Sequence, residues 1–122
     1  MAGKIVADTL EHSTAGSIAT NYVVNGSAKA WLSGTVDADL TDSLNFSSGT
    51  DVGTGDFDYT LANAAASQMD DSYLGVTAGG AAYYGRIGTG DTTTTVVDVK
   101  IHNSSATLSD SAHFVIFVGD LA

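Results

Sequence analysis

The sequence predicts an all-β protein: an antiparallel β-sandwich or jelly-roll-like domain with an extended N-terminal arm. Composition is the first reason, because the 122 residues are rich in Ser, Thr and Asp and include 14 glycines but no proline. Such a composition disfavours long helices and favours short strands joined by tight turns. The second reason is that short segments with alternating apolar and polar residues recur along the chain, separated by turn residues. The length fits a single domain.

The first 27 residues differ from the rest, so we expect an arm over 1–27 and the sandwich domain over 28–122. Residues 4–10 are consistent with one extended segment, and residues 11–17 are polar and lack a core face. A stretch of this kind either is mobile or becomes ordered only against a partner. Asn25-Gly26 predicts a type I′ hairpin turn between the flanking apolar segments, because this dipeptide tolerates positive φ.

Alternation then predicts a series of short strands. The strand candidates are residues 43–47, 57–61, 72–77, 92–102 and 113–118, and residues 51–56 are expected to form a turn. In the second of them, Phe57, Tyr59 and Leu61 share one face, which we expect to be buried. The alanine-rich residues 61–67 predict at most a single helical turn, which is too short to be stable alone.

The last strand candidate breaks the pattern, because His113-Phe114-Val115-Ile116-Phe117-Val118 is apolar on both faces. A half-buried antiparallel strand should alternate. This strand is therefore either central and covered on both sides, or it lies at a contact between subunits.

The charge excludes several classes of partner. Fourteen acidic residues against four basic ones give a net charge of −10. With only Lys4, Lys29, Arg86 and Lys100 as cations, we expect no binding to nucleic acid, since a phosphate backbone needs many more. No apolar run is long enough to span a membrane, and no signal peptide is recognisable, so we expect synthesis in the cytoplasm and no membrane partner.

We expect no catalytic site, metal site or cofactor. The three histidines, His12, His102 and His113, are not brought together by the sequence, and no nucleophile elbow is present. The glycine-rich residues 85–90 lack the ending of a phosphate-binding loop. Two aspartate clusters offer oxygen ligands suited to Ca²⁺, but neither has EF-hand spacing. The clusters are Asp37, Asp39 and Asp42, and Asp51, Asp56 and Asp58.

Several short motifs resemble, in order, a module found in phage tail-fibre and other virion surface proteins. They are Ala28-Lys29-Ala30-Trp31, Asp42-Ser43-Leu44-Asn45-Phe46-Ser47-Ser48, Gly53-Thr54-Gly55-Asp56, Tyr59-Thr60, Tyr73 and Phe114-Val115-Ile116-Phe117-Val118-Gly119-Asp120. The resemblance implies a virion protein. Since a tail fibre is usually far longer, a short arm with one sandwich implies a capsid decoration or cement protein.

The resemblance implies a homotrimer whose N-terminal arm bridges subunits of the major capsid protein or another virion protein. Apolar side chains of the arm and of the sandwich domain are the expected oligomer or capsid interface. They are Ile5, Val6, Leu10, Tyr22, Val24, Trp31, Phe114 and Ile116. Two alternatives remain open. One is a short tail-fibre or spike module that binds host glycans through Tyr83 and Tyr84, and the other is a stand-alone carbohydrate- or Ca²⁺-binding sandwich, with a hydrolase as a distant third.

Overall fold

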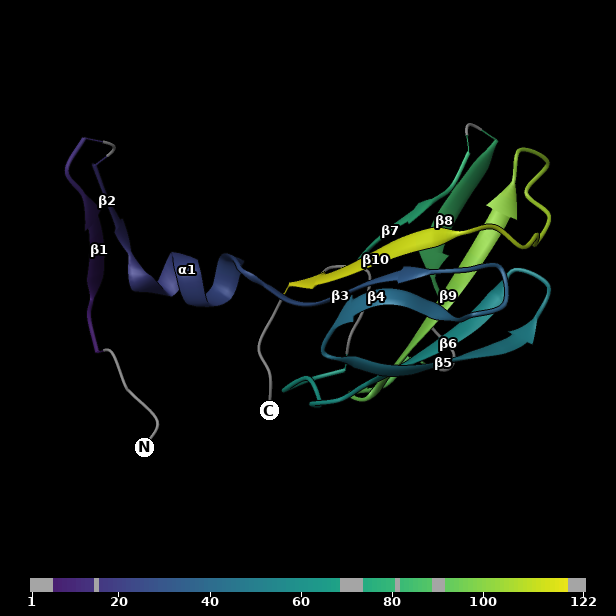
Figure 1. Cartoon of the computed structure of the whole chain (residues 1–122), viewed down its shortest axis with the longest axis horizontal. Helices are drawn as coiled ribbons and strands as arrows, with labels where there is room; N and C mark the ends of the chain where they lie inside the picture. The colour runs from purple at the N-terminus through teal and green to yellow at the C-terminus, as the bar shows by residue number, and fades with distance from the viewer. Residues whose placement is uncertain (1–5, 15, 69–73, 81, 89–91, 119–122) are drawn as a thin grey trace.

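The fold was analysed in a computed structural model, which describes residues 6–14, 16–68, 74–80, 82–88 and 92–118. Two antiparallel four-stranded sheets form an all-β sandwich, which confirms the predicted fold class (Figure 1). The first sheet has the order β4-β3-β10-β7. Its strands are β3 (Ala28–Gly34), β4 (Leu40–Leu44), β7 (Leu74–Ala78) and β10 (His113–Val118).

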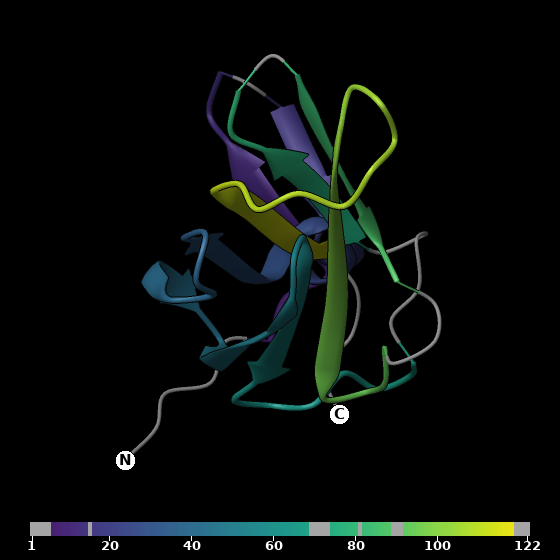
Figure 2. The same cartoon turned by 90° about the vertical axis from the view of Figure 1, so that its right-hand side faces the viewer.

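The second sheet has the order β5-β6-β9-β8. Its strands are β5 (Phe46–Gly53), β6 (Asp56–Leu61), β8 (Tyr83–Ile87) and β9 (Val96–Asn103). Figure 2, which looks along the long axis of the molecule, shows the green β9 and the yellow β10 in different layers. The chain changes sheet four times, between β4 and β5, β6 and β7, β7 and β8, and β9 and β10.

The core lies between the sheets and follows from the alternation in the sequence. On β6, Phe57 and Tyr59 are fully buried, with Leu61 nearly so, as predicted. Strand β9 contributes Val97, Val99 and Ile101 to the same core. The first sheet closes it with inward side chains of β3 and β10, namely Ala30, Leu32, Val115 and Phe117. Burying a large apolar side chain stabilises the fold by about 1.5–3 kcal/mol, so these strands hold the sandwich together.

The segment before β3 contains a hairpin and a short helix. Strands β1 (Thr9–His12) and β2 (Gly16–Ala19) pair antiparallel, and α1 (Thr20–Gly26) follows directly. The hairpin turn predicted at Asn25-Gly26 is wrong, because these residues end α1, where the amide of Ser27 donates to the carbonyl of Val23. Asn and Gly favour helix ends as well as hairpin turns, so the dipeptide alone does not distinguish the two. The turn between β1 and β2 instead leads into Gly16, whose φ is +88°.

Two smaller predictions also need correction. Residues 61–67 form no helical turn, because their backbone pairs with the start of the β9 segment: the amides of Leu61 and Ala65 donate to the carbonyls of Thr95 and Thr94. The polar residues expected to form a turn at 51–56 partly belong to β5, which continues to Gly53. Strand pairing across the sheet therefore overrides the local turn propensity.

Candidate docking face

The outer side of the first sheet carries a patch of large apolar side chains. The strand register aligns Leu44, Trp31 and Ile116 in one row across β4, β3 and β10. Phe114 lies two residues from Ile116 on the same side, and its ring stacks on Trp31 at 6.3 Å between centroids with 21° between planes. We call these four residues, Trp31, Leu44, Phe114 and Ile116, the Trp31 face.

Three residues of the Trp31 face are exposed to solvent, and Trp31 between them is half-buried. Leu44 is 49% exposed, Phe114 38% and Ile116 36%. Strand β10 is central in its sheet, but no described segment covers its outer side, so it is not covered on both sides as the first alternative expected. The second alternative, a contact between subunits, stays a prediction. Its two-sided apolar character has a simple cause: Val115 and Phe117 fill the core, whereas Phe114 and Ile116 point outward.

A shallow hollow of about 220 Å³ adjoins the Trp31 face at Phe114. It is lined by Ser33, Ala78, Gly79, Ala112, His113 and Phe114. The lining is mostly small or apolar, which suits an apolar side chain of a partner, since interface anchors are commonly side chains seated in such depressions.

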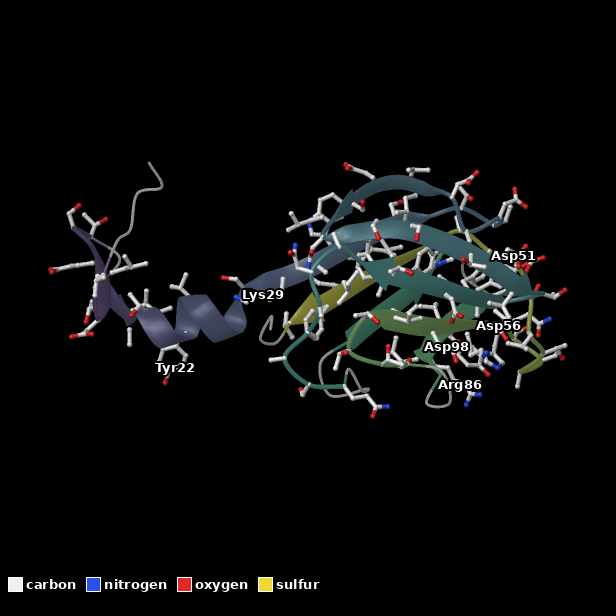
Figure 3. All side chains as sticks on the ribbon, turned by 90° about the horizontal axis from the view of Figure 1, so that it is seen from below. Tyr22, Lys29, Asp51, Asp56, Arg86 and Asp98 are labelled. Atoms are coloured by element: carbon white, nitrogen blue, oxygen red, sulfur yellow. The ribbon has the colours of Figure 1, made fainter. Side chains whose placement is uncertain are left out.

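The outer side of the second sheet has the opposite character. The ammonium group of Lys100 lies 2.5 Å from Asp56 and 3.1 Å from Asp98. Asp98 is 2% exposed, and its burial raises the pKa of the carboxyl, although Lys100 opposes this shift. Figure 3 shows Asp56, Asp98 and Arg86 together on this side of the sandwich. We call Asp56, Asp58, Arg86, Asp98 and Lys100 the charged face.

His113 is buried and has a structural role. Its Nδ1 lies 2.8 Å from the carbonyl of Ser111, and its Nε2 lies 2.7 Å from the hydroxyl of Tyr59. A carbonyl only accepts, so Nδ1 carries the proton and the Tyr59 hydroxyl donates to Nε2. Burial lowers the pKa of His113, an effect that the hydrogen bond to Ser111 partly offsets. Both side chains are almost fully buried, although His113 borders the hollow beside Phe114, and their hydrogen bond joins β6 to β10.

The remaining candidate residues form no common site. Among the described residues, no group of three His, Asp or Glu side chains is arranged to hold a metal ion. Tyr83 and Tyr84 are consecutive in β8 and so point to opposite sides, and Tyr84 stacks on His102 at 5.2 Å. Both are exposed, but they lie on different sides of the strand, and glycan binding through them stays a prediction. Residues 85–87 of the glycine-rich segment belong to β8 rather than to a phosphate-binding loop.

The arm carries a second exposed apolar surface. Leu10 and Ile18 are paired directly across β1 and β2 and are 45% and 46% exposed. Val6 and Tyr22 are also exposed, whereas Ile5 and the side chain of Val24 lie outside the described part of the chain. Figure 1 shows the hairpin and α1 projecting away from the sandwich. Within the part of the chain that is described, no helix is long and apolar enough to cross a membrane.

Sequence reasoning therefore found Trp31, Phe114 and Ile116, which the structure brings together, but missed Leu44 and Ile18. Leu44 joins the Trp31 face only through the register between β3 and β4, and Ile18 joins Leu10 only through the hairpin. Gly16, a residue that favours positive φ, was the one local signal for that hairpin. Comparisons with protein-family models, with curated proteins and with solved structures found no match.

Proposed function

We propose that this chain is a structural protein of a phage particle that decorates the capsid, assembling as a homotrimer and contacting capsid subunits through its N-terminal arm. The observation that supports it is the Trp31 face: contiguous apolar side chains left open on one side of an otherwise acidic sandwich. Large exposed apolar patches on a soluble fold mark surfaces that other chains cover.

The distribution of charge fits a particle surface. The charged face would point to solvent, where a strongly acidic exterior keeps particles apart. The Trp31 face would point toward other protein chains. Repetition of a small contact around a symmetric shell gives strong attachment even when each contact is weak.

The arm suits capsid contact because its side chains are available. Val6 and Tyr22 are exposed and lie ahead of the sandwich, and Ile5 precedes them in the sequence. An extended N-terminal end can add to an exposed strand or fill grooves between subunits. Its ordering on binding costs conformational entropy, which the many copies on a particle would offset.

The test is to purify particles and measure the copy number and position of the protein, with the full chain and with a chain lacking residues 1–7. Decoration predicts hundreds of copies on the head for the full chain, and loss of attachment for the shortened chain with its oligomeric state retained. A handful of copies at the tail, or normal decoration by the shortened chain, would contradict the proposal.

A further inference from the structure

We propose that the apolar side of the β1–β2 hairpin of one copy covers the Trp31 face of a second copy. The inference rests on the self-association in the proposed function and names the surfaces that make it. Both surfaces are exposed within one chain, and both are apolar. This inference assigns the hairpin to a neighbouring copy. It leaves Val6, ahead of the hairpin, and Tyr22, after it, for contact with the capsid.

The hairpin needs a partner to be stable. A two-stranded hairpin is at best marginally stable in water, and a third layer or strand is normally required. The pairing of Leu10 with Ile18 puts both side chains on one side of the hairpin, nearly half exposed. Figures 1 and 3 show this hairpin and α1 at a distance from the sandwich of the same chain.

The charges favour this side of the hairpin. Glu11 pairs with Ser17 in the next register position, so both point to the side opposite Leu10 and Ile18. The row that receives the hairpin, formed by Leu44, Trp31 and Ile116, is uncharged. Asp42, two residues from Leu44 on the same side of β4, borders this row. A chain with a net charge of −10 therefore approaches a copy of itself most easily along the uncharged row itself.

The area that a stable association needs also favours a role for the arm. Exposed apolar patches on a single protein measure about 300–600 Å². A stable interface buries roughly 800 Å² on each partner. If every copy both donates a hairpin and receives one, each copy has two such contacts. A contact between two different surfaces closes into a ring when the rotation allows it, as a trimer requires.

The path of the chain directs the arm outward. Ser27 ends α1 in an extended conformation, with ψ of 142°, and its hydroxyl donates to the carbonyl of Val23. Strand β3 begins at the next residue, Ala28. The helix therefore continues away from the sheet rather than folding back over β3, as Figure 1 shows.

The chain is well suited to a direct test, because it has no cysteine and a single tryptophan, Trp31. Purified Leu10→Cys and Leu44→Cys proteins, distinguished by a tag, are mixed, unfolded, refolded together and treated with a short bis-maleimide. We expect a crosslinked product that joins one copy of each variant. The matched control is Leu10→Cys mixed with Thr50→Cys, since Thr50 lies on β5 in the other sheet, and it should give little product.

In a Leu10→Cys/Leu44→Cys double variant, a crosslink that forms only within single chains would overturn the inference. It would show that the hairpin packs on the sandwich of its own chain. Absence of any Leu10–Leu44 product would also overturn it. These results need no capsid, so they are independent of whether the protein decorates a particle. Failure of decoration with intact crosslinking would reject the proposed function alone.

Trp31 fluorescence gives a second readout. Assembly should shift its emission to shorter wavelength as concentration rises, because the hairpin displaces water from the indole. Leu10→Ser/Ile18→Ser should weaken self-association by roughly 100-fold. The control Glu11→Gln/Ser17→Ala changes the other side of the hairpin and should leave the shift in place. Equal behaviour of the two double variants would contradict the inference.

Discussion

His113 is held in its neutral form by two neighbours with fixed hydrogen-bonding roles. The Ser111 carbonyl takes the proton of Nδ1, and the Tyr59 hydroxyl donates to Nε2. Protonation of the ring would place a second proton against that hydroxyl, inside the core. Burial also raises the pKa of Tyr59, so the hydroxyl keeps its proton and remains the donor.

The pH dependence of stability follows from this arrangement. The pKa of His113 in the folded protein lies below its ordinary value of 6.5, so the unfolded chain takes up the proton first. The contribution of His113 to stability is complete above pH 6.5 and is lost as the pH falls from there through the lowered pKa. The midpoint of urea unfolding should therefore drop on acidification below pH 6.5, and His113→Gln should reduce this slope. Equal slopes in both proteins would contradict the assignment.

Lys100 compensates two carboxylates on the charged face. Asp98 is almost fully buried beside it, and a buried charge without a partner is costly. Lys100→Met should therefore destabilise the fold by about 3–5 kcal/mol at neutral pH. The double variant Lys100→Met/Asp98→Asn should recover part of that loss in urea unfolding. A double variant less stable than Lys100→Met would show that the carboxylate of Asp98 has another stabilising partner.

At the scale of elements, the close approach of β3 to β6 depends on the absence of a side chain at Gly34. A Cβ at Gly34 would lie 2.9 Å from Nε2 of His113 and closer still to the hydroxyl of Tyr59. Gly34→Ala should therefore disrupt this hydrogen bond and cost about 1–3 kcal/mol, measured by thermal or urea unfolding. Gly53→Ala is the control, since no atom lies within 4 Å of the added carbon. Equal stability of the two variants would contradict this account.

The turn from β4 into β5 is a second such point. Asn45 has φ of +60°, a conformation that Asn adopts more easily than most residues. Its side-chain oxygen accepts hydrogen bonds from the backbone and side-chain amides of Asn63 at 2.9 and 2.8 Å. Asn45 thus has a clear structural role, because it lies where the chain passes from one sheet to the other.

Much of the sandwich could be predicted from the sequence, because alternation is a local property. Phe57, Tyr59 and Leu61 identify β6 and its buried side without knowledge of any partner strand. The hairpin and α1 could not be predicted in the same way, since Asn25-Gly26 suits a turn and a helix end equally. The Trp31 face was predicted in part. Its members on β10 follow from the two-sided strand, whereas Leu44 depends on register between strands far from β10 in sequence.

At the scale of the whole molecule, the two sheets divide the polar and apolar surfaces between them. The charged face contains Arg86 and Lys100, and Lys100 is paired with Asp56 and Asp98. The Trp31 face presents aromatic and aliphatic groups. A free monomer would leave both the Trp31 face and the apolar side of the hairpin in water. Covering them costs association entropy. The free energy gained by burying apolar area must exceed that cost.

The central claim is that this sandwich associates with copies of itself through its exposed apolar surfaces. The mass of the purified full chain in solution tests this claim most directly. Light scattering at micromolar concentration should give three times the chain mass of 12.4 kDa, and Leu10→Ser/Ile18→Ser should shift the protein to smaller species. A mass of 12.4 kDa for the full chain across that concentration range would contradict the account.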